Sequence, residues 1–66
     1  MQQGTVKWFN SVRGYGFIVG DDGGDIFVHQ SEILMKGFRF LEAGQRVSYQ
    51  VKSVEKGNKA VNVILK

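Results

Sequence analysis

The sequence predicts an all-β protein, a small five-stranded antiparallel barrel in Greek-key order. Apolar and polar residues alternate over short runs, which is the period of a half-buried strand, and glycine-rich or polar turns separate these runs. Only residues 31–35 have a helical pattern, a single turn that Ser31 would cap and Gly37 would end. The chain contains no linker, repeat or low-complexity tract.

The first three strands are expected to pair in sequence. Residues 5–10 and 15–19 are joined by the loop 11–14, and residues 25–30 follow the turn 21–24. Successive side chains of a strand point to opposite faces, so the second and third strands together form one aromatic and one aliphatic face. The aromatic face carries Tyr15, Phe17, Phe27 and His29, and the aliphatic face carries Ile18, Ile26 and Val28.

The last two strands complete the barrel. Residues 60–65 alternate through Val61 and Val63 after a loop at 56–59. Residues 46–52 alternate strictly, and the side chains expected to face inward are Val47, Tyr49 and Val51. Five short strands in one small domain suit the partly open Greek-key barrel of the OB-fold.

The aliphatic face is the expected core. Branched aliphatic side chains fill a small interior well, whereas a face edged by Lys7, Arg13 and His29 can stay in water. Aromatic stripes in strands are more often buried, but a chain of 66 residues cannot bury both faces. Gly14 and Gly16 would also let a ligand approach the backbone of the aromatic face.

Length and composition limit the class of protein. We expect one domain, residues 1–66, with little room for an enclosed catalytic cavity. The sequence has no cysteine for a disulfide or thiolate metal site, no apolar run long enough to span a membrane and no secretory signal pattern. We therefore expect a cytoplasmic protein that uses no cofactor or metal and binds neither a membrane nor a small-molecule substrate.

Rings and cations alternate in the first half of the chain. Six of the eight aromatic residues lie between Lys7 and Arg39. Rings can stack on bases while cations neutralise phosphates. The net charge of +3 favours polyanions, and half of the six acidic residues, Asp21, Asp22 and Asp25, gather at one turn. The sequence therefore predicts a binder of single-stranded nucleic acid.

Three segments of the chain form a recognisable set: Lys7-Trp8-Phe9-Asn10, Arg13-Gly14-Tyr15-Gly16-Phe17-Ile18 and Ile26-Phe27-Val28-His29. They resemble the three hallmark segments of the cold-shock domain. Residues 37–39 and 41–45 resemble that family too, so the similarity covers essentially the whole chain, and a stand-alone domain of this size is similar to bacterial cold-shock proteins.

The resemblance implies a monomer that binds single-stranded RNA and DNA with low sequence preference, favouring pyrimidines. It also implies an RNA chaperone that keeps transcripts unpaired, with roles in translation and transcription antitermination. The positions that match the family's base-stacking rings are Trp8, Tyr15, Phe17, Phe27, His29 and Phe38. The remaining binding positions are Lys7, Arg13 and Lys56 near the nucleic-acid backbone, and Asn10, Asp25 and Gln30 near base edges.

The chain departs from the family pattern at a few positions. Gln30 stands where bacterial members commonly carry an aromatic residue, as it does in Y-box relatives, and Asn58 replaces a usual proline. Phe40 replaces a small polar residue, and Leu34 and Met35 add apolar area nearby. We expect this patch to cover the open end of the barrel rather than to mediate self-association.

Other classes of protein fit less well. An RNA-recognition motif needs two helices and the reverse order of its aromatic motifs. The spacing of Asp21, Asp25 and Glu32 resembles an EF-hand loop without its required glycine, and residues 14–16 are half of a dinucleotide fingerprint without a following helix.

An enzyme is not favoured either, because the sequence lacks the residues for general acid–base or nucleophilic catalysis: His29 is the only histidine, and no nucleophile has an evident base. A small barrel that binds protein through the same rings stays open, and a weak salt dependence of binding would indicate it.

Overall fold

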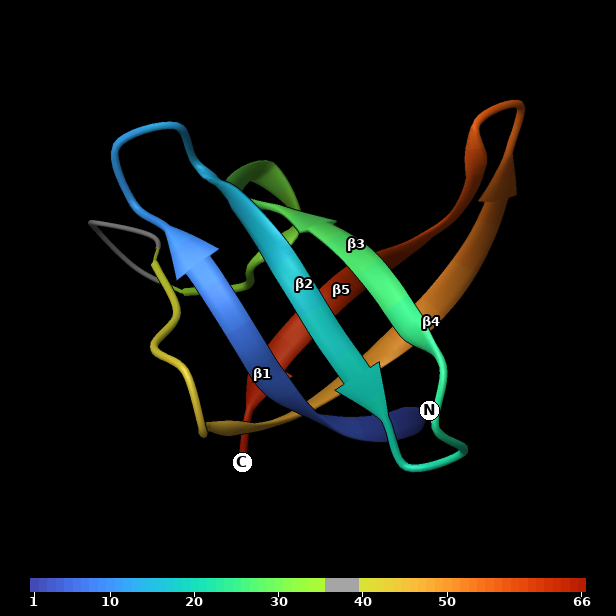
Figure 1. Ribbon diagram of the computed structural model, residues 1–66, viewed down its shortest axis with the longest axis horizontal. Helices are drawn as coiled ribbons and strands as arrows, with labels where there is room; N and C mark the ends of the chain where they lie inside the picture. Colours follow the sequence, from blue (N-terminus) through green and yellow to red (C-terminus); the bar gives the residue numbers. More distant parts are fainter. Residues whose placement is uncertain (36–39) are drawn as a thin grey trace.

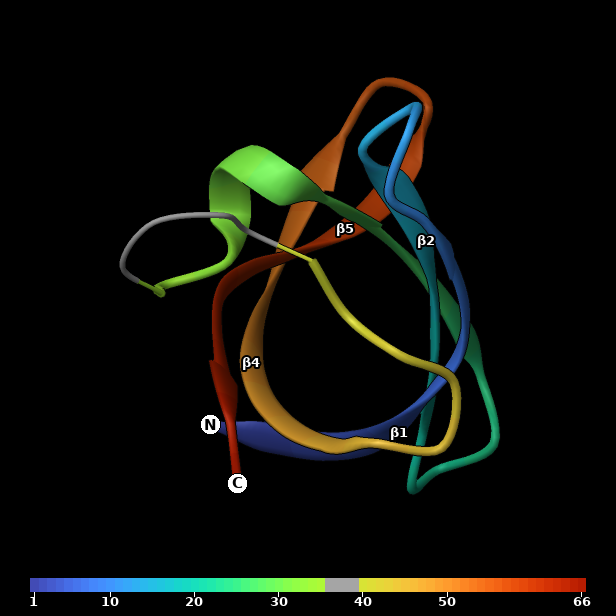
Figure 2. The same ribbon diagram turned by 90° about the vertical axis from the view of Figure 1, so that its left-hand side faces the viewer.

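The computed structural model describes residues 1–35 and 40–66, which form a closed five-stranded barrel. The strands follow one another around the barrel in the order β1-β2-β3-β5-β4. Figure 1 shows β1, β2 and β3 side by side in front of β4 and β5, and Figure 2 shows the strands curving around a common interior. The all-β barrel predicted from the sequence is confirmed. Its elements are β1 (Gln2–Asn10), β2 (Tyr15–Gly20), β3 (Asp25–His29), the 3-10 turn η1 (Gln30–Glu32), β4 (Arg46–Val54) and β5 (Gly57–Leu65).

The barrel closes through a short parallel contact. The pairs β1·β2, β2·β3, β1·β4 and β4·β5 are antiparallel, as the sequence predicts. Strands β3 and β5 instead run parallel and pair only at Phe27 with Lys59 and at Val28 with Ala60. Because β5 reaches β3 after the chain has crossed the barrel, alternation within each strand does not reveal this direction.

The core consists of inward side chains from every strand. The predicted choice of face is confirmed, because Ile18 and Val28 are fully buried and Ile26 is nearly so. A bulge in β1 between Val6 and Trp8 shifts the register against β2, so that Lys7 and Trp8 are both exposed. The buried apolar residues are Val6, Ile18, Ile26, Val28, Ile33, Leu41, Val47, Tyr49, Ala60 and Val63.

The β4–β5 hairpin differs from the expected pattern. Val47 and Tyr49 are buried, and Val51 faces inward as predicted, on the same side as its buried register partner Ala60, although 38% of it is exposed. The register between β4 and β5 shifts between Ser48 and Gln50, and Asn62 adopts a positive φ of 53°. The extra residue lies in β5, where it interrupts the predicted alternation through Val61 and Val63: Ala60 and Val63 are buried, whereas Val61 is half-buried.

Both strands of this hairpin extend further than predicted. Strand β4 continues to Val54, and β5 begins at Gly57, within the segment 56–59 that was expected to be a loop. The hairpin therefore turns through residues 55–56 alone and projects beyond the barrel at the upper right of Figure 1.

Strand β3 ends one residue earlier than expected. Gln30 belongs to η1, which replaces the predicted helical turn at 31–35, and its N-cap is His29 rather than Ser31. The Nδ1 atom of His29 accepts from the backbone N–H of Ser31, which is how a capping side chain satisfies a free helical donor. Gly37, the predicted end of the turn, lies outside the described residues.

A charged contact links three segments at the lower end of the barrel. The guanidinium of Arg46, at the start of β4, donates to both carboxylate oxygens of Asp21 at 2.8 and 2.9 Å and to Thr5 Oγ1 at 2.9 Å. This hydrogen bonding lowers the pKa of Asp21 and raises the pKa of Arg46, with burial opposing both shifts.

Candidate nucleic-acid interface

Four rings form a continuous cluster on the outer face of β1, β2 and β3. Trp8 contacts Tyr15 and Phe17 with ring centroids 5.9 and 5.5 Å apart, and Phe27 lies 5.9 Å from each of Tyr15 and Phe17. These spacings are typical of edge-to-face and tilted aromatic contacts. Three of these rings were predicted to share a face with His29, and Trp8 joins them. From here on we call Trp8, Tyr15, Phe17 and Phe27 the aromatic face, and His29 lies next to it.

Strand pairing places the rings of the aromatic face. Phe17 is the register partner of both Trp8 on β1 and Phe27 on β3, so these three rings lie in one row across the sheet. Trp8 is 40% exposed, and the other three rings are half-buried against one another rather than in the core. The row therefore offers solvent a set of flat apolar surfaces without contributing to the barrel interior.

Glycines allow the strands to come close behind the rings. A Cβ atom on Gly16 would lie 2.7 Å from the Cα atom of Phe9 in the paired strand, so a larger residue would push β1 and β2 apart. Gly14 has a positive φ of 79°, and the side-chain amide of Gln30 occupies the space that its Cβ would need.

The cations of the predicted site surround the aromatic face. Lys7 Nζ lies 3.0 Å from Asp25 Oδ2, so these two predicted site residues form an exposed ion pair. Such a pair contributes little to stability, which leaves both groups able to exchange partners when a ligand arrives. Arg13 is exposed in the loop between β1 and β2.

Asn10 has a structural role in that loop. Its Oδ1 atom accepts from the backbone N–H groups of Val12 and Arg13, each at 3.0 Å. The sequence prediction gave Asn10 a contact with a base edge. The structure shows that its side-chain oxygen already holds the loop that contains Arg13.

His29 and Gln30 lie at the upper end of the aromatic face. His29 is the register partner of Tyr15, and its ring is half-buried. The backbone N–H of Gln30 donates to the Gly14 carbonyl oxygen at 2.7 Å, which joins η1 to the loop between β1 and β2. The described site residues thus form one surface, whereas Phe38 lies outside the described residues.

A groove of about 400 Å³ lies between the rings and the β4–β5 hairpin. The predicted site residue Lys56 lies at its edge, but four of the lining residues were not predicted as site residues. These four, Val54, Gly57, Asn58 and Lys59, enter the site because the hairpin is longer than expected, and the apolar alternation of β4 does not indicate this because it ends at Val51. The groove is lined by Phe17, Phe27, Val54, Lys56, Gly57, Asn58 and Lys59.

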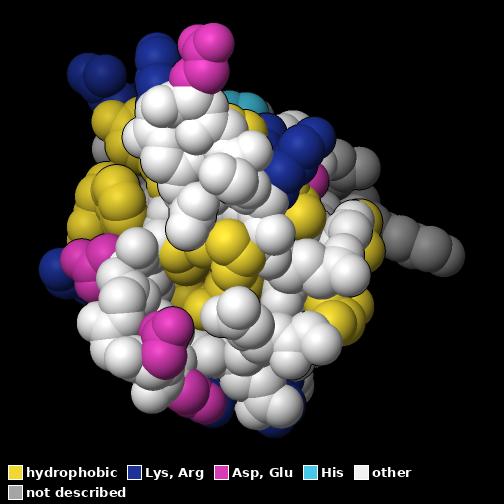
Figure 3. All heavy atoms as spheres, turned by 90° about the vertical axis from the view of Figure 1, so that its right-hand side faces the viewer, with side chains coloured by type: hydrophobic (Ala, Val, Ile, Leu, Met, Phe, Trp, Pro, Cys, Tyr) yellow, Lys and Arg dark blue, Asp and Glu magenta, His cyan; other side chains and the backbone are white. Residues whose placement is uncertain are grey.

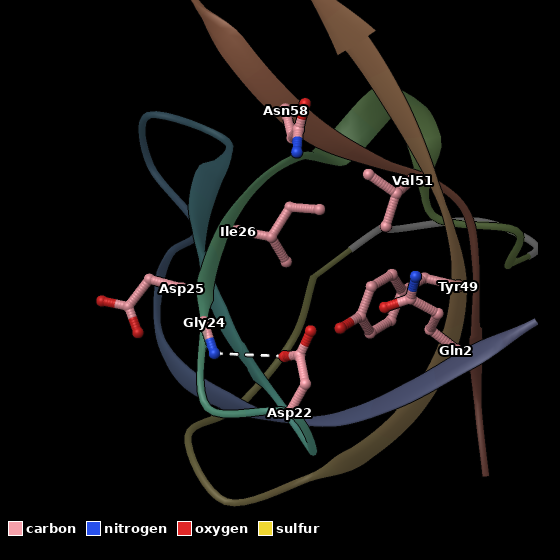
Figure 4. Close-up of a pocket in the computed structure, with 8 residues that line it drawn as sticks. All are labelled: Gln2, Asp22, Gly24, Asp25, Ile26, Tyr49, Val51 and Asn58. Carbon is pink, nitrogen blue, oxygen red and sulfur yellow. Dashed lines mark hydrogen bonds between the residues drawn. The ribbon is translucent and has the colours of Figure 1, made fainter.

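A smaller cavity of about 180 Å³ opens on the opposite side of β3, between β3 and β4. Figure 3 shows apolar side chains in a hollow on this side of the barrel, with acidic side chains below them. In Figure 4 the Tyr49 hydroxyl points toward Asp22, whose Oδ1 atom accepts from the Gly24 N–H. Burial, followed by the charges of Asp22 and Asp21, raises the pKa of Tyr49.

Within residues 1–35 and 40–66, no three metal-ligating side chains come together. None of the helical segments described there is long and apolar enough to cross a membrane.

Comparisons with known proteins agree with this architecture. The profile of the 'Cold-shock' DNA-binding domain matches residues 2–66. The chain is 53% identical over 64 residues to Cold shock protein 1 of Lactiplantibacillus plantarum, which covers 97% of both chains. It is 51% identical over 63 residues to Cold shock protein CspC of Bacillus subtilis, which covers 96% of both.

A solved structure shows the same fold at lower similarity. The structure of drosophila Unr CSD456 superposes with a TM-score of 0.81 over 98% of this chain and 26% of that one, at 23% identity. That likeness concerns the fold alone. The profile match and the two relatives place the chain in the cold-shock domain family, whose members are nucleic-acid-binding, non-enzymatic proteins.

Proposed function

We propose that this protein, as a single cold-shock domain, binds single-stranded RNA and DNA on the aromatic face. The observation that carries the proposal is the continuous contact among Trp8, Tyr15, Phe17 and Phe27 on the outside of the barrel. Any base offers a π-face to such rings, and base–aromatic stacking tolerates any sequence. A duplex, whose bases are already stacked on one another, would gain far less from the same surface.

The cations support a path for the phosphates along the rings. Lys7 and Arg13 lie at the β1 side of the aromatic face, and Lys56 and Lys59 lie at the groove beside β3. We infer that a single strand crosses the three strands of the sheet between these two groups, with Asp25, His29 and Gln30 beside the bases. Phe38 and Asn10 belong to the same proposed site from the sequence resemblance.

A low preference for base identity would suit an RNA chaperone. A protein that stacks on any unpaired base shifts transcripts toward the unpaired state, which would assist translation and transcription antitermination in the cytoplasm. A preference for pyrimidines follows from the ligand, since a purine-rich strand stacks on itself more strongly and must be unstacked before binding. We propose that a monomer performs these roles.

Titration of Trp8 fluorescence tests this function. Oligothymidine should quench Trp8 and bind more tightly than oligoadenosine of the same length, while duplex DNA should bind much more weakly. The affinity for oligothymidine should fall steeply with salt because bound cations release counterions from the phosphates. Equal affinity for single strand and duplex would contradict the mechanism, and salt-independent binding would indicate a protein-like apolar contact instead.

A further inference from the structure

The turn η1 determines which nitrogen of the His29 ring carries the proton. The backbone N–H of Ser31 points at Nδ1 of His29 with a donor–acceptor distance of 3.1 Å, and Ser31 Oγ lies 3.0 Å from the same nitrogen. A neutral imidazole has one N–H and one acceptor nitrogen. Because Nδ1 accepts from a backbone donor, the proton of the neutral ring must reside on Nε2.

The donor that fixes this tautomer is itself held by the fold. The Gln30 N–H donates to the Gly14 carbonyl at 2.7 Å, and the Ile33 N–H donates back to the Gln30 carbonyl at 3.1 Å. The turn is thereby fixed at its first residue and at the residue after its end, with Ser31 between them. On the other side, His29 is the register partner of Tyr15 in the aromatic face.

We propose that Ser31 is a positioning residue for nucleic-acid recognition, which holds His29 in its Nε2–H form so that the ring presents a hydrogen-bond donor to the ligand. The inference rests on the proposed function, since it assigns a chemical preference to one position of that site. A donor at this point selects an acceptor oxygen. That oxygen belongs either to a base carbonyl, as in thymine and uracil, or to a phosphate, whereas an exocyclic amino group would be disfavoured.

Nitrogen NMR of the His29 ring tests the tautomer directly. At mildly alkaline pH, where ordinary histidines are neutral, the free protein should show Nε2 protonated and Nδ1 unprotonated as the sole neutral form. Ser31→Ala keeps the backbone donor and should keep this form, while Ser31→Pro removes the donor and should admit the Nδ1–H form. A substantial Nδ1–H population in the unmodified protein would overturn the proposal, whether or not Ser31→Pro folds.

Binding of oligothymidine tests the contact. The Nε2–H proton signal should move downfield and exchange more slowly with water once the strand is bound. His29→Phe keeps a ring on the surface but removes the donor, and it should lower affinity about two- to tenfold, the value of one hydrogen bond. Ser53→Ala, a serine variant on the exposed part of β4, should leave the affinity unchanged.

Two strands of equal length distinguish the source of the acceptor. A larger loss for oligothymidine than for oligocytidine in His29→Phe would identify the O4 carbonyl of thymine, which cytosine replaces by an amino group, and equal losses would identify an acceptor that both strands carry, a phosphate or the O2 carbonyl. An unchanged Nε2–H signal together with normal Trp8 quenching would refute the role of His29 while leaving the proposed function intact. An absence of Trp8 quenching would instead contradict the proposed function.

Discussion

Phe27 and Val28 are adjacent in the chain but face opposite sides of β3, and this separates binding from stability. Phe27 contacts two rings of the aromatic face, whereas Val28 is fully buried in the core. Phe27→Ala should weaken binding of oligothymidine by roughly 1 to 3 kcal/mol, the value of one stacked base, with a moderate loss of stability. Val28→Ala should instead lower the free energy of unfolding by on the order of 2 kcal/mol because it leaves a cavity.

Fluorescence titration and denaturant unfolding of both variants provide the comparison, and each variant is the control for the other. If Phe27→Ala lost stability on the scale of a buried phenylalanine, about 3 to 5 kcal/mol, the aromatic face would be part of the core rather than a ligand surface.

At Gln30 the site offers an amide where a ring would give a broader stacking surface. The side chain lies over Gly14, beside His29, and is exposed. Gln30→Phe should raise the affinity for oligothymidine by about 1 kcal/mol, the low end for one stacked base, without changing the salt slope because no phosphate contact is added. Binding isotherms at several salt concentrations measure both the affinity and the salt slope of the two proteins. An unchanged affinity would show that the bound strand does not extend to residue 30.

At the scale of elements, the sequence predicts the sheet β1-β2-β3 better than the hairpin β4–β5. Strict alternation around Ile18 and Ile26 identifies the inner face because β2 and β3 pair without irregularity. Alternation through Val61 and Val63 fails in β5, since the extra residue at Asn62 puts Ala60 and Val63 on the inner face. Bulges depend on contacts with the neighbouring strand, and a single strand's pattern does not contain them.

In the candidate site, too, residues on regular strands were predicted from the sequence better than those on irregular segments. Tyr15, Phe17 and Phe27 were predicted to share a face because they lie on regular strands, and the structure adds Trp8, which follows the bulge in β1 and contacts Tyr15 and Phe17. The predictions for η1 were less accurate, because the cap at His29 is a ring nitrogen rather than one of the usual capping hydroxyl or carboxylate groups. The groove was missed because it needs two elements far apart in sequence, β3 and the tip of the hairpin.

Two of the lysines on the β4–β5 hairpin differ in their position relative to the groove. Lys56 lies at the tip, at the edge of the groove, and Lys52 lies on β4 of the same hairpin but does not line the groove. Lys56→Gln should therefore weaken binding to oligothymidine and reduce the slope of log affinity against log salt by about 0.7, the value for one phosphate on a single strand. Lys52→Gln removes the same charge and should change the slope less. Equal changes in the two variants would mean that only net charge matters.

At the scale of the whole molecule, stability should fall at both ends of the pH range, for different reasons. At the acid end, hydrogen bonding to Arg46 lowers the pKa of Asp21 below the ordinary value of 3.8. The unfolded chain then takes up this proton first, so the contribution is present above 3.8 and is lost as pH falls through the lower, folded-state pKa.

Removal of the guanidinium tests the acid end. Arg46→Gln should flatten the acid loss of stability measured by urea unfolding, because Asp21 loses the hydrogen bonds that lower its pKa. Arg13→Gln removes the same charge from the loop between β1 and β2 and is the matched control. If both variants flattened the acid loss equally, overall charge repulsion rather than the Asp21–Arg46 contact would be responsible.

At the alkaline end, ionisation of the buried hydroxyl of Tyr49 should account for part of the loss of stability. Only 1% of Tyr49 is exposed, and burial raises its pKa above the ordinary value of 10.0. Below that pH the side chain is protonated in both states. As pH rises beyond it, the unfolded chain ionises first and binds fewer protons than the folded one, so the free energy of unfolding falls until the folded-state pKa is passed.

Tyr49→Phe removes this ionisable group. Urea unfolding of the variant should show a shallower loss of stability at alkaline pH. Near neutral pH its free energy of unfolding should lie within about 1 kcal/mol of that of the unmodified protein. An alkaline decline as steep as before would mean that Tyr49 ionises equally easily in both states, and hence that its hydroxyl meets solvent through the cavity between β3 and β4.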